Sequence, residues 1–118
     1  VGFSEHSLVK KDGIKASKVA LWLGAKIIER HFTILDDKST KDGPVSINPN
    51  DLKELVKFSK LDNSSMKEQI VNEIPDFQKM LGHEERDLSS EELINRDYYR
   101  GRFASKRTNG EYWFNWEN

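Results

Sequence analysis

Two short segments with alternating apolar and polar residues constrain the fold of this chain most: VGFSEHSL at residues 1–8 and IIERHFTI at residues 27–34. Such alternation is typical of β-strands, whose successive side chains point to opposite faces. Between the two segments, residues 14–23 carry apolar side chains at helical spacing, and Gly24 is placed to end a helix. The order strand, helix, strand predicts a parallel pair joined by a right-handed crossover, because the connection is too long for a hairpin.

We expect the strands at residues 1–6 and 25–33, followed by a polar loop at 36–44 and a second helix. Asn48 is the predicted cap of that helix, with Pro49 in its first turn and Asp51 favoured by the helix dipole. The residues predicted to face inward are Leu52, Leu55, Val56 and Ser59. The fold class is therefore α/β, built from two β–α units.

The rest of the chain has a different character. After a predicted loop at 62–65, residues 66–81 have a helical pattern that Pro75 interrupts, which predicts two short helices. Ser89 with Glu92 indicates a capping box for a further helix, and Asn109-Gly110 predicts the turn of a C-terminal β-hairpin. The predicted division is residues 1–61 as the βαβα part, 62–97 as a helical connector and 98–118 as an aromatic hairpin tail.

Aromatic residues are concentrated in the predicted tail. They are Tyr98, Tyr99, Phe103, Tyr112, Trp113, Phe114 and Trp116. Such a group can form a stacking platform for bases or sugars. Packing of the hairpin onto the body of the protein is the reading we favour, because large aromatic side chains dominate core burial.

Charge and composition exclude several classes of function. The chain has 118 residues, 33% of them charged, and a net charge of −1, with acids and bases interspersed. It has no basic footprint for nucleic acid, no polybasic run for a membrane surface, no apolar run that spans a bilayer and no signal-peptide pattern. Cysteine is absent, which rules out disulfide and thiolate chemistry. We expect a cytoplasmic location, with neither nucleic acid nor membrane as partner.

Two of the three histidines stand at matching positions near the ends of the predicted strands. Gly2, Ser4 and His6 share one face of the first strand, and Ile27, Glu29 and His31 share one face of the second. In parallel, in-register strands, about 4.8 Å apart, the two imidazoles can reach one metal ion. Imidazole with carboxylate and water suits manganese, magnesium or iron, and zinc is not excluded. The alternative is a pair of hydrogen-bonded structural histidines.

The sequence also gives expectations for three further charged or titratable residues. Glu29 is expected to be buried between two helices, and a buried carboxylate needs a partner or a function. Arg30 is expected on the opposite face, where it can form a salt bridge with a helix. His83, in a sequence typical of a solvated loop, is assigned no chemistry.

Four segments together resemble the end of the catalytic barrel of the sialic acid synthase family. They are VGFSEHS, LGAKIIERHFT, DGPVS and NPNDLKELV, in this order, within residues 1–61. The resemblance implies a (β/α)8 barrel of which these strands are the last two. It also implies a condensation of phosphoenolpyruvate with N-acetylmannosamine, or a related N-acyl amino sugar, that gives a nonulosonic acid and phosphate.

The same resemblance implies a role for each site residue. His6 and His31 match the ligands of a divalent metal, most often Mn2+, with Mg2+ or another divalent ion as alternatives. Ser4 matches a residue near the phosphate of phosphoenolpyruvate, and Glu29 matches an acid close to the reacting atoms. The family's loop carries an aspartate after Gly-Pro, but here Gly43-Pro44 is followed by Val45, so Asp42 is the candidate substitute for sugar binding.

Length is the second departure from the family. A complete barrel needs about 200–250 residues, so we expect this chain to be a fragment that is inactive alone. Its open sheet edges predict a homodimer or association with the rest of the barrel. Two other functions stay open: a non-catalytic interaction module derived from such a barrel, and another metal-dependent barrel enzyme that acts on phosphoenolpyruvate or a sugar phosphate.

Overall fold

The computed structural model describes residues 1–82, 86–99 and 104–114. The chain divides into two units, Val1–Gly82 and His83–Asn118, and each is described here by itself. The finer division predicted at residues 61 and 97 stays a prediction. No helix in the described ranges has the length and apolar character needed to cross a membrane.

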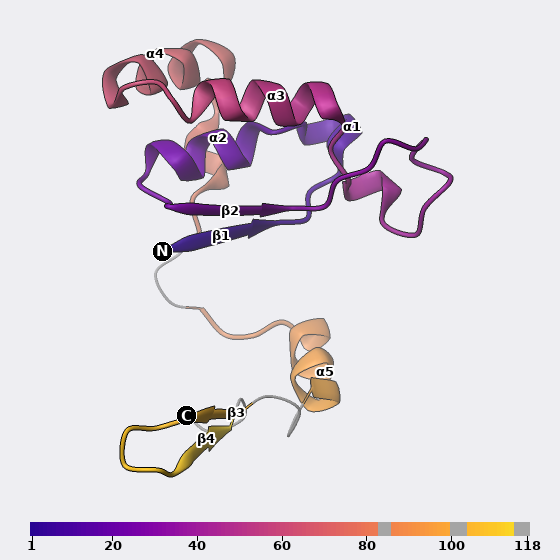
Figure 1. Cartoon of the computed structure of the whole chain (residues 1–118), viewed down its shortest axis with the longest axis vertical. Helices are drawn as coiled ribbons and strands as arrows, with labels where there is room; N and C mark the ends of the chain where they lie inside the picture. The colour runs from indigo at the N-terminus through magenta and orange to yellow at the C-terminus, as the bar shows by residue number, and fades with distance from the viewer. Residues whose placement is uncertain (83–85, 100–103, 115–118) are drawn as a thin grey trace. The chain divides into compact units, whose positions relative to one another are not determined.

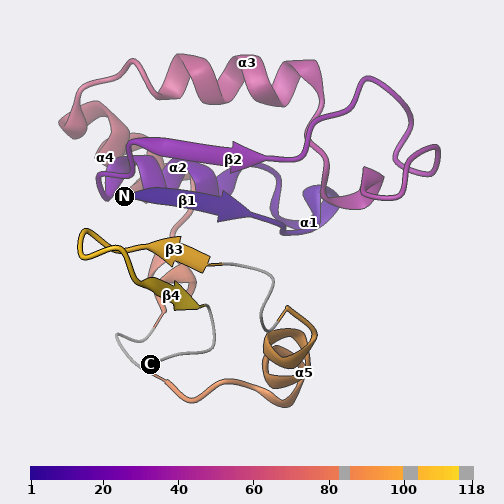
Figure 2. The same cartoon turned by 60° about the horizontal axis from the view of Figure 1, so that its bottom comes forward.

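A pair of parallel strands lies at the centre of the first unit. β1 (Gly2–Glu5) pairs with β2 (Ile27–Arg30), and Ser4 stands opposite Glu29 in the register. The connection between the strands contains the short helix α1 (Val9–Asp12) and the longer helix α2 (Lys15–Trp22). The predicted parallel pairing is confirmed. Figure 2 shows both strands running in the same direction.

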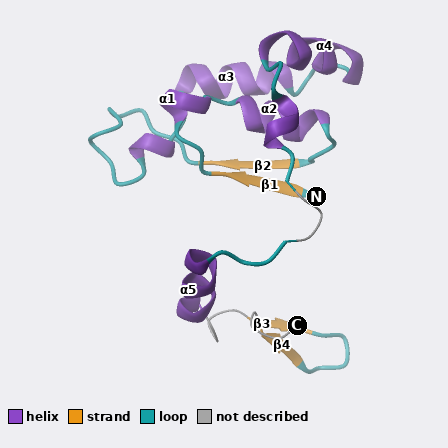
Figure 3. Ribbon diagram, turned by 180° about the vertical axis from the view of Figure 1, so that it is seen from behind, coloured by secondary structure: helices purple, strands orange, loops and turns teal. Residues whose placement is uncertain are grey.

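The longer helices of this unit cover one face of the strand pair, as Figures 1 and 3 show. They are α2, α3 (Pro49–Phe58) and α4 (Asn63–Glu73), followed by the 3-10 turn η2 (Phe77–Met80). Two apolar clusters hold the helices together. One contains Val19, Phe58, Ile70 and Ile74, and the other contains Ile14, Ile47 and Leu55. The opposite face of the strand pair carries the polar residues of the candidate site.

Capping side chains explain where helices α3 and α4 begin. Asn48 is the cap, as predicted, and accepts hydrogen bonds from the amides of Asn50 and Asp51. The Asp51 carboxylate accepts from the Asn48 amide, which completes a capping box that was not predicted. Asp62 caps α4 by accepting from the amide of Ser65, so the loop predicted at 62–65 is wrong: these residues are the cap and first turn of a helix. A cap satisfies amides that the first helical turn leaves without partners, which explains both starts.

The inward face of α3 differs in part from the prediction. Leu55 is buried as expected, and Phe58, which was not predicted, is 2% exposed. Leu52 and Val56 are 41% and 45% exposed, so their predicted burial is wrong. The helix packs its Leu55–Phe58 side onto the two apolar clusters, and leaves the Leu52–Val56 side along a groove beside β2.

The second unit contains the helix and the hairpin that the sequence predicts. Helix α5 (Ser90–Tyr99) begins at the expected capping box, since Ser89 and Glu92 exchange backbone-to-side-chain hydrogen bonds. β3 (Ala104–Lys106) and β4 (Tyr112–Phe114) are antiparallel, with a turn at Asn109-Gly110 in which Gly110 has a φ of 90°. His83, Phe103 and Trp116 lie outside the described residues.

Candidate functional site

His6 and His31 follow directly after the ends of β1 and β2, on the same face of the pair. Their ring centroids are 4.9 Å apart and their planes meet at 75°. The parallel register brings the two rings together, because each histidine comes one residue after the matched pair Glu5 and Arg30. The convergence of the imidazoles expected from the sequence is therefore present. What they bind is a separate question.

Ser4 and Glu29 lie next to the histidines, one step earlier along their strands. The Ser4 hydroxyl donates to Oε1 of Glu29 over 2.7 Å, and its oxygen lies 3.2 Å from Nε2 of His6. A hydroxyl has one proton. Since that proton goes to Glu29, the Ser4 oxygen accepts from Nε2–H of His6, and the lone pair of the neutral His6 ring then lies on Nδ1.

Asp42 reaches the same place from the loop that follows β2. Its Oδ2 atom is 3.8 Å from Nδ1 of His31, and the two side chains are 55% and 36% exposed. This separation is too long for a hydrogen bond and short enough for attraction to a protonated ring. The structure thus brings together all five residues selected from the sequence: Ser4, His6, Glu29, His31 and Asp42.

The expected burial of Glu29 is wrong, because its side chain is exposed. Glu29 lies on the face of the strand pair that the helices leave open. The buried carboxylate is that of Glu5, which is 3% exposed on the opposite face. Burial of a charge therefore identifies Glu5 as the carboxylate that needs a partner.

Glu5 and Arg30 form a buried ion pair that sequence reasoning missed. Nη1 of Arg30 lies 2.6 Å from Oε1 of Glu5, and their side chains are 4% and 3% exposed. Ser17 and Ser7 donate to the Glu5 carboxylate, and Nη2 of Arg30 donates to the Gly13 carbonyl. The salt bridge expected between Arg30 and a helix is thus wrong, since its partner is on the neighbouring strand. The sequence signal was available: opposite charges stand one residue before each histidine.

The two histidines have the chemistry of metal ligands. Within the described residues, no group of three or more histidine and acidic side chains is arranged to hold a metal ion. Two imidazoles on adjacent strand ends fit as two ligands of a divalent cation, and the exposed face leaves room for further ligands. The residues present therefore fit a metal that takes its remaining ligands from elsewhere.

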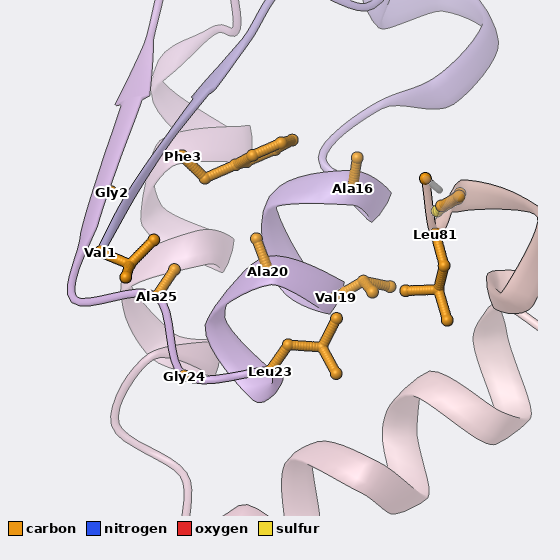
Figure 4. A pocket seen from close by; sticks show the side chains of 12 residues that line it. Val1, Gly2, Phe3, Ala16, Val19, Ala20, Leu23, Gly24, Ala25 and Leu81 are labelled. Carbon is orange, nitrogen blue, oxygen red and sulfur yellow. The ribbon is translucent and has the colours of Figure 1, made fainter. Parts of the chain in front are cut away.

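An apolar groove of the first unit has a different character. It lies between β1, α2 and the segment at Leu81, and its lining side chains are apolar, as Figure 4 shows. None of the side chains that line it is ionisable. The groove therefore offers no side chain for acid–base or metal chemistry.

Comparison with known proteins shows the family. Residues 1–85 match the NeuB family. The chain belongs to the NeuB family. The spore coat polysaccharide biosynthesis protein SpsE of Bacillus subtilis is similar to it, with 34% identity over 106 residues, which are 89% of this chain and 27% of that protein. An N-acetylneuraminate-9-phosphate synthase of Drosophila melanogaster is 40% identical over 55 residues, which are 47% of this chain and 14% of that protein.

One solved structure is also similar. It is an N-acetylneuraminic acid (sialic acid) synthetase from Leptospira borgpetersenii in complex with citrate, with 26% identity, a TM-score of 0.44, and coverage of 83% of this chain and 28% of that one. The chain thus spans about a quarter or less of the length of these relatives. The resemblance to the sialic acid synthase family seen in the sequence is confirmed.

Proposed function

We propose that this chain is the metal-binding end of a NeuB-type (β/α)8 barrel enzyme that joins phosphoenolpyruvate to an N-acyl amino sugar, giving a nonulosonic acid and phosphate. The observation that carries the proposal is the cluster of Ser4, His6, Glu29 and His31 at the carboxyl ends of two parallel strands. Parallel α/β folds place their sites at this end. Family membership supports the reaction class, and the names of the relatives support a role in sialic acid or surface carbohydrate biosynthesis. A cytoplasmic location is part of the proposal.

His6 and His31 would hold the divalent cation, with Mn2+ as the first choice and Mg2+ as an alternative. When bound, such a cation supplies Lewis-acid polarisation of a sugar carbonyl. The imidazoles are already adjacent, so little conformational entropy is lost when they bind one ion. The contact from Ser4 sets the orientation of the His6 ring.

Glu29 is the proposed proton-transfer residue. Its carboxylate is exposed on the site face and held by the Ser4 hydroxyl at 2.7 Å. A carboxylate positioned in this way accepts or returns a proton at the reacting carbonyl or at a water molecule. Ser4 itself is proposed to lie near the phosphate of phosphoenolpyruvate, and Asp42 at the sugar end. N-acetylmannosamine and modified amino sugars are both candidate acceptors.

Metal binding is the direct test of the site. We would titrate the 118-residue chain with Mn2+ and follow the loss of the free-ion signal by electron paramagnetic resonance. His6→Ala and His31→Ala should each remove binding, and His83→Ala is the matched control that should retain it. Equal affinity in all three variants would contradict the proposed site and favour a non-catalytic module.

Turnover is tested with the product of the complete reading frame. Phosphate release from phosphoenolpyruvate is measured with several N-acyl amino sugars, with and without chelator. We expect release to depend on both the sugar and the cation, and Glu29→Gln to lower it by about 100-fold or more. Release from phosphoenolpyruvate without any amino sugar would point to a different barrel enzyme.

A further inference from the structure

The loop between β2 and α3 carries Asp42, and two contacts restrict the position of this loop. One is an ion pair between the loop and α1. The other is a close backbone contact at Gly43. Neither feature belongs to the histidine cluster itself.

The ion pair joins Lys10 of α1 to Asp37 of the loop. Their charged atoms are 2.7 Å apart, and the side chains are 79% and 28% exposed. The hydrogen bond from Lys10 lowers the pKa of Asp37, and the same contact raises the pKa of Lys10. Because α1 follows β1 directly, this pair connects the end of the first strand to the loop that leaves the second strand.

Gly43 provides the close contact. It is buried at the start of the 3-10 turn η1 (Gly43–Val45), which packs against α1. A Cβ atom added at this position would lie 2.7 Å from Cα of Asp37 and closer still to the Asp37 carbonyl group. The obstruction is backbone and not a flexible side chain. Any larger residue at position 43 must therefore displace the loop backbone at Asp37 or at position 43 itself.

The turn then fixes Asp42. The Asp42 carbonyl accepts from the Ser46 hydroxyl at 2.7 Å and from the Val45 amide at 3.2 Å. These bonds hold the backbone of Asp42, and its carboxylate stands 3.8 Å from the His31 ring. A small displacement at Gly43 or Asp37 would therefore move the carboxylate away from the ring.

We infer that Lys10, Asp37 and Gly43 are positioning residues that hold Asp42 beside His31. They form a brace that sets the sugar end of the site. The effect of these residues on the sugar end of the site rests on the proposed function. Their effect on the position of Asp42 rests only on the geometry of the loop. The brace connects the ends of the two strands through the loop. It thereby holds the exposed Asp42 carboxylate in a defined position.

The test uses two substitutions with matched controls. Gly43→Ala is compared with Gly82→Ala, where an added Cβ meets no atom within 4 Å. Lys10→Gln is compared with Lys11→Gln, an exposed neighbour for which no ion pair is seen in the described part of the chain. The double variant Lys10→Asp with Asp37→Lys reverses the ion pair and should restore its effect.

Two measurements separate the brace from the proposed function. Backbone 15N relaxation in the metal-free chain should show order parameters at Asp42 and Val45 that fall from about 0.85 to below about 0.6 in Gly43→Ala and Lys10→Gln. Mn2+ affinity should fall by about tenfold in the same variants, because the displaced Asp42 carboxylate stands beside the proposed ligand His31 and changes next to a metal ligand have effects of this size. The controls and the charge-reversed double variant should match the unmodified chain, and Lys10→Gln should keep its unfolding midpoint.

Each outcome decides the inference. Unchanged order parameters in Gly43→Ala and Lys10→Gln overturn the brace whether or not the chain binds metal. An equal loss of Mn2+ affinity in Lys10→Gln and Lys11→Gln also overturns it, because a general charge effect would then be the cause. The unmodified chain can fail to bind Mn2+ while the two variants still show raised mobility at Asp42 and Val45. That result supports the brace and contradicts the proposed function.

Discussion

At the scale of single residues, two glutamates on neighbouring strands have opposite roles. Glu5 points to the helices and is paired with Arg30, and Glu29 points to the open face and accepts from Ser4. Glu29 stands opposite Ser4, and Glu5 is the residue after Ser4, so the alternation of side chains along a strand puts the two glutamates on opposite faces. One carboxylate therefore stabilises the fold and the other is available for chemistry.

Replacing these two glutamates should have very different effects on stability. Glu5→Gln leaves the buried Arg30 charge without a counter-charge and should lower the free energy of unfolding by about 3–5 kcal/mol. Glu29→Gln, on the exposed face, should change it by less than about 0.5 kcal/mol. Urea unfolding followed by circular dichroism measures both, and equal midpoints would contradict the assigned roles.

At the scale of elements, the cap of α3 makes a separate prediction. Asn48→Ala removes the acceptor for two amides of the first turn and should destabilise the first unit by about 1 kcal/mol. Asn50→Ala is the control, because its backbone amide, not its side chain, takes part in the cap. Thermal unfolding compares the two variants, and a larger loss in Asn50→Ala would show that the cap is not the stabilising feature.

The start of α5 makes a prediction about pH. Hydrogen bonds from Arg86 and from the Ser89 amide lower the pKa of Glu92 to about 2, from its usual 4.5. The folded pKa lies below the unfolded one, so this contribution to helix stability is complete above about 4.5 and is lost as the pH falls toward 2. Carboxyl NMR titration should give this low midpoint. Arg86→Gln should raise it and Arg96→Gln should not.

At the scale of the whole molecule, the first unit exposes apolar surface away from its polar site. The groove of about 400 Å³ along β1 and α2 is lined by residues such as Leu23, which is 57% exposed. Apolar grooves of this kind mark interaction surfaces. We therefore expect self-association that rises with concentration in sedimentation velocity experiments, weakened by Leu23→Ser and unaffected by the control Leu88→Ser. A single monomeric species at every concentration would contradict this expectation.

Much of the fold was predictable because the local signals agreed with one another. Alternation at both strands, the apolar spacing of α2, the cap at Asn48 and the Asn-Gly hairpin turn each matched the structure. The placement of Leu52 and Val56 was not predictable, since the inward face of a helix depends on which neighbours it meets. The Lys10–Asp37 contact was hidden for the same reason, because it joins segments that have no shared local pattern.

By itself, the sequence determined the two strands and the helix between them, the matching positions of His6 and His31 and the family to which the chain belongs. These features depend on periodicity and on short-range spacing, which the order of residues specifies directly. Only the tertiary structure decided which glutamate is buried and how Asp42 reaches His31. The first depends on which face the helices cover, as Figure 3 shows, and the second on how the loop folds back on itself at Gly43. Local periodicity specifies neither of them.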